Sequence, residues 1–215
     1  MIGDKLVITA YHHENGEKTA AAFATAFGNI GRPATVTVAG ESGSGKSETA
    51  AALAEALEKR GLKTLILGQD DYFKLPPKSN AAKRREDISW VGTSEVRLDL
   101  MDAHLRAAKA GESAVVKPLV FFDEDRIGEE RLSLQDVNVV IAEGTYTTAL
   151  EEADFRAFID GDYHHTLAHR KKRARDEVEG AFIEQVLEIE HRIISGHKAR
   201  ADIVLPPNPE YQDTP

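Results

Sequence analysis

Short β-branched or apolar runs alternate with longer amphipathic segments along most of the chain. Five such runs predict strands, and they cover residues 35–39, 63–67, 137–142, 155–160 and 201–205; the first three are predicted to be buried. Between them, apolar residues spaced three and four positions apart predict helices, as at Ala50, Leu53, Ala54 and Leu57. Strands that alternate with helices predict an α/β domain with a parallel sheet flanked by helices.

The chain is expected to have three parts, of which the first precedes this alternation. Residues 5–11 predict a strand and residues 17–27 a helix. We expect an extension over residues 1–33 that packs on the main domain, residues 34–207, with a tail over residues 208–215. Packing on the sheet edge is the simpler account of the extension, and an exposed face that joins a homodimer is the alternative.

Three histidines fall within these predicted elements. His12 and His13 follow the first predicted strand, where neighbouring residues point to opposite faces. An ordinary exposed pair is therefore favoured over a metal site. His104 lies on the apolar face of a helix predicted over residues 96–108, which favours packing over catalysis.

Two stretches are polar or interrupted by proline. Residues 74–87 predict a turn-rich connection near a substrate entrance, in which Arg84 and its basic neighbours either attract an anionic substrate or face solvent. Residues 113–122 predict extended structure, and Pro118 favours an edge strand or hairpin. Arg126 would lie at the tip of that hairpin, which either faces a substrate or is a plain charged turn.

Residues 40–47, GESGSGKS, match the phosphate-binding loop pattern G-x-x-x-x-G-K-[ST] between a predicted strand and a predicted helix. Glycines let successive backbone N–H groups point at one anion, and the start of the helix adds its positive end. Lys46 can reach the β- and γ-phosphates, and the Ser47 hydroxyl can ligate Mg²⁺. The nucleotide-binding candidates are Gly40, Glu41, Ser42, Gly43, Ser44, Gly45, Lys46, Ser47 and Glu48.

Two acids end predicted strands, where open parallel sheets bind ligands. Asp70 follows the second strand and could accept the proton of an attacking hydroxyl or help to hold a metal; the alternative is a turn cap. Glu143 closes the hydrophobic run of residues 137–142, where a carboxylate can orient Mg²⁺ directly or through water.

Composition narrows the range of functions. The chain has 215 residues, a net charge of −9 and no cysteine, which excludes disulfides and a cysteine nucleophile and disfavours nucleic-acid binding. No apolar run approaches the roughly 18 residues of a membrane span, and no signal-peptide core is present, so a cytoplasmic location is expected. In this acidic chain the basic cluster of residues 169–176 predicts a lid, with the polar face of a helix as the alternative.

Four stretches together resemble the uridine kinase and phosphoribulokinase group of P-loop kinases. They are GESGSGKS at 40–47, QDDYF at 69–73, IAEG at 141–144 and ADIVLP at 201–206. The resemblance implies a P-loop nucleoside-triphosphate-binding fold, ATP and Mg²⁺ as cofactors, and Ser47 and Glu143 at the metal. It also implies catalytic roles for Asp70, Lys46 and the lid arginines Arg170, Arg173 and Arg175. Implied substrate contacts are Asp70, Tyr72, Phe73, Phe121, Arg126 and Gln185.

The chain departs from the group in the segment that helps to hold a nucleoside. The group's Pro-x-Tyr-Asp-Phe stretch is replaced by PLVFF at residues 118–122. The resemblance therefore implies an ATP-dependent small-molecule kinase whose acceptor is a nucleoside such as uridine or another sugar-like alcohol. The alternative is a nucleotide-binding regulatory protein or switch without kinase turnover. Neither account calls for nucleic acid or a membrane as a partner.

Overall fold

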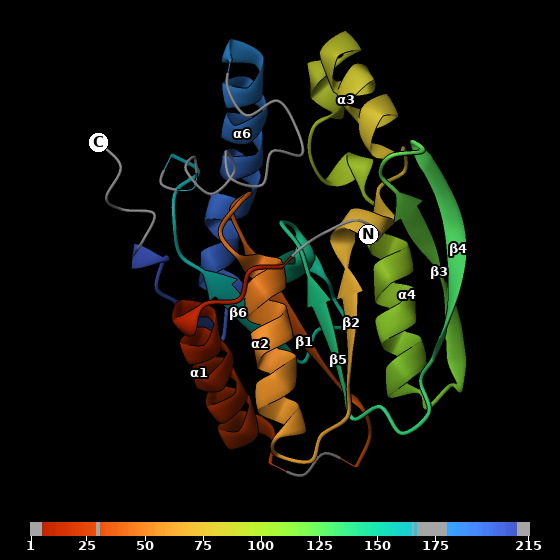
Figure 1. Cartoon of the computed structure of the whole chain (residues 1–215), viewed down its shortest axis with the longest axis vertical. Coiled ribbons are helices and arrows are strands. Elements are labelled where there is room, and N and C mark those ends of the chain that lie inside the picture. The colour runs from red at the N-terminus through yellow and green to blue at the C-terminus, as the bar shows by residue number, and fades with distance from the viewer. Residues whose placement is uncertain (1–5, 29–30, 165, 167–179, 210–215) are drawn as a thin grey trace.

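The main sheet has five parallel strands in the order β2-β5-β1-β6-β7, in a computed structural model that describes residues 6–28, 31–164, 166 and 180–209 (Figure 1). Each of the five predicted runs overlaps one of these strands, so the predicted α/β fold class is confirmed. The strands are β1 (Ala34–Gly40), β2 (Thr64–Gly68), β5 (Val139–Glu143), β6 (Phe155–Ile159) and β7 (Ile203–Leu205).

Helices cover both faces of the sheet because side chains of β5 alternate between two hydrophobic cores. Val139 and Ile141 join the core beneath α1 and α2, whereas Val140 and Ala142 join the core beneath α4. The helices are α1 (Ala10–Phe27), α2 (Lys46–Glu58), α3 (Pro77–Glu86), α4 (Leu98–Lys109) and α6 (Ala181–Ile194). None of the helices in the described ranges is long and apolar enough to cross a membrane.

Shorter elements connect these layers. Strands β3 (Ala114–Phe121) and β4 (Arg126–Ser133) form a separate antiparallel hairpin, which confirms the hairpin prediction around Pro118. The 3₁₀ turns are η1 (Gln69–Tyr72), η2 (Ile88–Trp90), η3 (Thr93–Glu95), η4 (Thr147–Ala149) and η5 (Ser195–Arg200).

Strand β2 lies at the edge of the sheet, where the sequence predicted a buried strand. Leu67 is its one buried residue, and Ile66 is 37% exposed. The prediction of burial was wrong because β2 pairs with β5 alone, which leaves its other edge without a neighbouring strand in this sheet. An apolar run of this length does not reveal its position in the sheet.

The N-terminal extension is a single long helix over its described residues. Residues 6–9 have no regular structure and α1 begins at Ala10, so the strand predicted over residues 5–11 is wrong from residue 6 onward. Thr9 precedes the helix, and its backbone N–H donates to Nδ1 of His12 at 3.0 Å. His12 is 1% exposed and His13 is exposed, so the expectation of an exposed pair holds for His13 alone.

Helix α1 packs backbone to backbone on α2 at Gly16. A Cβ atom added to Gly16 would lie 2.6 Å from the carbonyl carbon of Ala52. We expect Gly16→Ala to lower the free energy of unfolding by about 2 kcal/mol, because the two helices must separate. This would reverse the usual gain from alanine inside a helix. The measurement is urea unfolding followed by circular dichroism.

Gly196→Ala is the matched control for this packing prediction. Gly196 also lies in a helical turn, and an added Cβ would meet nothing within 4 Å. Unfolding of this variant should match wild type or show a small gain in stability. If Gly16→Ala behaves in the same way, the close packing of α1 on α2 is wrong.

Residues 74–87, which were expected to be a turn-rich connection, contain helix α3. Its buried side is polar: Arg84 donates from Nε to Oε2 of Glu95 at 2.5 Å, and its Nη2 lies 3.3 Å from Oε1 of Glu190. Arg84 is thus committed to an internal ion-pair network rather than to solvent or an anionic substrate. The helix was not predicted because the buried side of α3 carries ion-paired residues in place of the usual apolar stripe.

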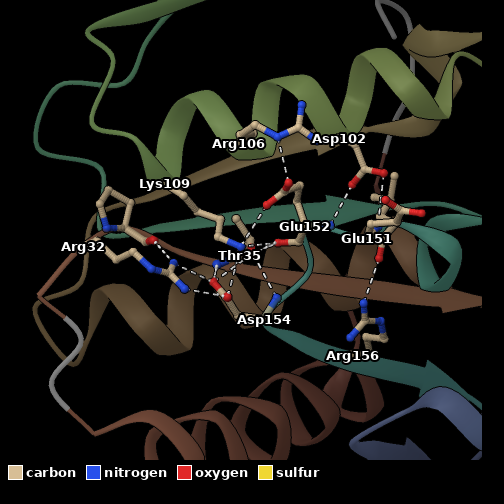
Figure 2. Close-up of polar contacts among 11 residues, drawn as sticks. Arg32, Thr35, Asp102, Arg106, Lys109, Glu151, Glu152, Asp154 and Arg156 are labelled. Atoms are coloured by element: carbon tan, nitrogen blue, oxygen red, sulfur yellow. Dashed lines mark hydrogen bonds and ion pairs between the residues drawn. The ribbon is translucent and has the colours of Figure 1, made fainter.

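A second polar network fastens the starts of β1 and β6 (Figure 2). Asp154 accepts two hydrogen bonds from Arg32, at 2.8 and 2.9 Å, and one from the Thr35 backbone N–H at 3.0 Å. Burial tends to raise the pKa of Asp154, but the bonds from Arg32 and Thr35 outweigh it and hold the pKa at about 2. Ionised Asp154 therefore stabilises the folded chain.

We expect Asp154→Asn to lower the free energy of unfolding by about 2 kcal/mol at neutral pH. The folded-state pKa of about 2 lies below the ordinary value of 3.8, so this contribution is complete above about pH 4. It is lost as pH falls toward 2. Urea unfolding of both proteins at pH 7, 5, 4 and 3 tests this expectation; the difference should shrink by about half at pH 3.

Arg106→Gln provides the surface control in the same network. Arg106 pairs with Glu152 at 2.8 Å, but its side chain is 62% exposed. An exposed pair contributes about 0–1 kcal/mol, so this variant should unfold almost as wild type does. If the difference in free energy of unfolding between wild type and Asp154→Asn stays constant down to pH 3, the stabilisation does not come from the ionised Asp154 carboxylate.

Candidate active site

The phosphate-binding loop lies between the carboxyl end of β1, the central strand, and the start of α2 (Figure 1). Gly40, Gly43 and Gly45 have φ angles of +153°, +79° and +86°, which side-chain-bearing residues rarely adopt. Helix α2 begins at Lys46, as the sequence predicted. The loop backbone and the positive end of α2 therefore face the same region, which suits an anion.

Lys46 and Ser47 contact different parts of this site. Nζ of Lys46 donates to the backbone oxygen of Glu41 at 2.7 Å, which holds the lysine over its own loop. The Ser47 hydroxyl donates to Oε2 of Glu143 at 3.2 Å. Residues separated by 96 positions are thus joined at the end of the sheet.

Strand register brings Glu143 between the ends of β1 and β2. Glu143 pairs with Val38 on one side and with Gly68 on the other. Burial and, to a smaller extent, the nearby Asp70 raise the pKa of Glu143, Lys46 and the bond from Ser47 oppose the rise, and the resulting pKa is about 7. A buried acid with a raised pKa would become fully ionised beside a divalent cation.

Two consecutive acids after β2 have different surroundings. Asp70 is exposed at the carboxyl end of the strand and lies close enough to affect the pKa of Glu143. Asp71 is 3% exposed and accepts from Nζ of Lys117 at 2.7 Å and from the Val120 N–H at 3.0 Å. Asp70 is therefore exposed to solvent at the strand end, whereas Asp71 ties the η1 turn to the hairpin.

The structure does not gather all the predicted substrate contacts around Asp70. Tyr72 is fully buried, and its hydroxyl is hydrogen-bonded to Nδ1 of His104 at 2.8 Å, so it offers no surface to a substrate in this conformation. This contact also confirms the packing role of His104. Phe73 is half-buried in the same core, and Gln185 is exposed on α6.

The tip of the β3–β4 hairpin brings Phe121 and Arg126 together. The Arg126 guanidinium lies 3.9 Å from the Phe121 ring centroid. Neighbouring Asp125 accepts from the backbone N–H groups of Lys78 and Ser79, which joins the tip to the start of α3. The predicted lid arginines Arg170, Arg173 and Arg175 lie outside the described residues.

Sequence reasoning missed two contributors to the site. Gln69 packs against Gly144, where an added Cβ would lie 2.2 Å from Cβ of Gln69, and its Oε1 accepts from the Tyr146 N–H at 2.7 Å. The absence of a side chain at Gly144 makes room for the Gln69 side chain. The second contributor is His191, which contacts Glu41 of the loop at 2.6 Å. Nothing in its local sequence indicates this contact.

A central parallel strand, a glycine-rich loop and a helix that begins at Lys46 define the class: a P-loop nucleoside-triphosphate-binding protein. A model of the phosphoribulokinase/uridine kinase family matches residues 35–209. The chain belongs to this family and is a small-molecule kinase of its type. The resemblance seen in the sequence is thereby confirmed.

Individual relatives are distant. The chain is 26% identical over 191 residues to the bifunctional α-galactosidase/sucrose kinase AgaSK of Mediterraneibacter gnavus, covering 83% of this chain and 20% of AgaSK. It is 24% identical over 186 residues to a uridine kinase of Leuconostoc citreum (strain KM20), covering 81% of this chain and 88% of that protein. The chain therefore spans a fifth of one of these relatives and most of the other.

Solved structures share the fold at low identity. A candidate fructose transport system kinase from Silicibacter sp. TM1040 superimposes with a TM-score of 0.63 at 18% identity, over 88% of this chain and 98% of that one. D-glycerate 3-kinase from Cryptococcus neoformans gives a TM-score of 0.58 at 14% identity, over 91% of each chain. These likenesses support the fold and leave the acceptor open.

Proposed function

We propose that this protein transfers the γ-phosphoryl group of ATP to a hydroxyl of a sugar-like alcohol. The observation that carries the proposal is the convergence of three strand ends. The loop that ends in Lys46 and Ser47 follows β1, Glu143 ends β5, and Asp70 follows β2. A phosphate cradle, a metal-binding pair and an exposed base thus share one edge of the sheet, as phosphoryl transfer requires.

Each residue has a chemical role in this proposal. The loop N–H groups and Lys46 hold the β- and γ-phosphates and stabilise charge that develops during transfer. Asp70 accepts the proton of the acceptor hydroxyl as its oxygen attacks the γ-phosphorus. The bond from that phosphorus to the β–γ bridging oxygen breaks, and ADP leaves.

The Ser47 hydroxyl and the Glu143 carboxylate fit a magnesium ion, which prefers oxygen ligands and keeps several waters. The described residues contain no group of three or more His, Cys, Asp or Glu side chains that could hold a metal alone. The two protein oxygens would thus act together with phosphate oxygens and water. Bound Mg²⁺ would neutralise charge on the triphosphate.

The names of the relatives support a sugar-like acceptor. Sucrose kinase, uridine kinase and glycerate kinase all name acceptors with several hydroxyls. In this chain Val120 and Phe121 stand where the nucleoside-binding stretch has tyrosine and aspartate, and the Phe121 ring contacts the Arg126 guanidinium. We therefore rank neutral sugars and sugar alcohols with nucleosides as acceptors to be tested.

The direct test is ATP turnover with Mg²⁺ against a panel of nucleosides, hexoses, disaccharides, sugar alcohols and glycerate. ADP release is followed enzymatically, and the product is identified by mass. One acceptor should raise turnover at least a hundredfold above the rate of ATP hydrolysis alone. Tight ATP binding with no stimulated turnover across the panel would count against the kinase account and favour a nucleotide-binding switch.

A further inference from the structure

Glu41 places a carboxylate inside a loop that is built to receive anions. It occupies the first variable position of GESGSGKS, and its side chain is 3% exposed. Lys46, the residue proposed to hold phosphates, is close enough to affect the pKa of Glu41. An uncompensated negative charge at this position would repel a triphosphate.

His191 of α6 supplies the compensating group. Its Nδ1 is hydrogen-bonded to Oε1 of Glu41 at 2.6 Å, although the two residues are 150 positions apart. The imidazole is 37% exposed, whereas the Glu41 side chain is 3% exposed, so the contact joins a surface ring to a buried carboxyl group. The pKa of Glu41 is raised because burial outweighs the opposing effects of His191 and Lys46.

Other charges around Glu41 are mainly negative. Asp162, which follows β6, and Glu190 of α6 are both close enough to interact electrostatically with Glu41. Besides His191, Lys46 also lowers the pKa of Glu41. Without the charge on His191, Lys46 would have to balance Glu41 as well as the phosphates.

Ser42, the loop residue after Glu41, is also held from outside the loop. The Thr166 hydroxyl donates to the backbone oxygen of Ser42 at 2.7 Å. The ring of Tyr163 lies 5.7 Å from the His191 ring, which places that imidazole between an aromatic side chain and the loop. The first two variable residues of the loop are therefore held by side chains from outside the loop.

We propose that His191 is a positioning residue for the phosphate-binding loop, whose imidazolium neutralises Glu41 and so permits a nucleoside triphosphate to bind. This inference rests on the proposed function in one respect: it takes the ligand of the loop to be a triphosphate. His191 acts through Glu41 and does not need to touch the nucleotide. The Glu41 backbone oxygen also receives Nζ of Lys46, so displacement of Glu41 would shift the lysine.

The test is a charge-neutralising mutant cycle, with binding of ATP and of inorganic tripolyphosphate measured by calorimetry in the presence of Mg²⁺. His191→Gln removes the positive charge and should weaken binding of both ligands about tenfold. Glu41→Gln removes the negative charge and should bind both at least as tightly as wild type. The double variant should return to within about threefold of wild type.

Arg192→Gln is the matched control on the same helix. Arg192 is 70% exposed and pairs with Glu188 one turn earlier, so loss of its charge should leave the dissociation constants unchanged. Thermal unfolding of each variant shows whether the helix remains packed.

Three results would overturn the inference. His191→Gln could bind ATP as well as wild type, Glu41→Gln could be as weak as His191→Gln, or the double variant could show no recovery. The last two results would indicate that the contact serves packing alone. If the wild-type protein binds neither ATP nor tripolyphosphate, the proposed function itself is overturned. If the wild-type protein binds them tightly and any of the three results is found, this inference alone is overturned.

Discussion

Asp70→Asn should lower turnover of the stimulated reaction about a thousandfold while the dissociation constant for ATP stays within about twofold of wild type. Asparagine keeps the size and polarity of the side chain but cannot accept the hydroxyl proton. Asp70 is exposed, so the melting temperature should be nearly unchanged. Steady-state kinetics, calorimetric ATP binding and thermal unfolding are measured on the same preparation.

Asp71→Asn is the contrasting variant, because the neighbouring acid is structural. The side chains of Asp71 and Lys117 are 5% and 6% exposed, and Oδ2 of Asp71 lies 2.7 Å from Nζ of Lys117. Loss of one partner should lower the free energy of unfolding by about 3 kcal/mol. Turnover of the protein that remains folded should fall far less than in Asp70→Asn. A large stability loss in Asp70→Asn, or full turnover in that variant, would contradict the role of Asp70 as the base.

Gly144→Ala should lower the free energy of unfolding by about 4 kcal/mol, which corresponds to a fall of roughly 10 °C in melting temperature. An added Cβ would lie 2.2 Å from Cβ of Gln69, and the φ angle of +152° is unfavourable for alanine. Relief of this overlap must move Gln69 or Glu143, which flank the proposed metal site. Turnover should therefore fall together with stability.

Gly111→Ala separates the overlap from the backbone strain. Gly111 also has a positive φ, of +76°, but an added Cβ would meet nothing within 4 Å. This variant should lose about 1 kcal/mol and keep its turnover. If Gly144→Ala loses no more stability than Gly111→Ala, Gln69 does not lie as close to the backbone at Gly144 as the structure places it.

The apolar runs were sufficient to predict the strands of the main sheet, and the glycine-rich motif was sufficient to predict the phosphate-binding loop. The runs that became β1, β5 and β6 are apolar because both of their faces are covered, and this pattern can be read directly. Parallel strands place their carboxyl ends together, so the grouping of Lys46, Ser47, Asp70 and Glu143 followed from their positions after three strands.

Elements that bury polar groups could not be recognised in this way. Helix α3 packs through Arg84 and its ion pairs, and α1 packs through small or polar residues such as Gly16 and His12. Helix α3 has one buried residue, the polar Asn80, and the first half of α1 lacks the apolar stripe that Ala20 and Phe23 give to its second half, the part that was predicted as a helix. The pairing of Glu41 with His191 joins residues 150 positions apart, and no local pattern specifies such a contact.

The most direct test of the central claim is transfer of the γ-phosphoryl group itself. ATP labelled at the γ-phosphate is incubated with Mg²⁺, the acceptor that most stimulates turnover, and either wild type or Asp70→Asn. The proposed function requires the label on the acceptor in wild type, in amounts equal to the ADP formed, and almost none in the variant. Label found only in inorganic phosphate, or equal transfer by both proteins, would contradict it.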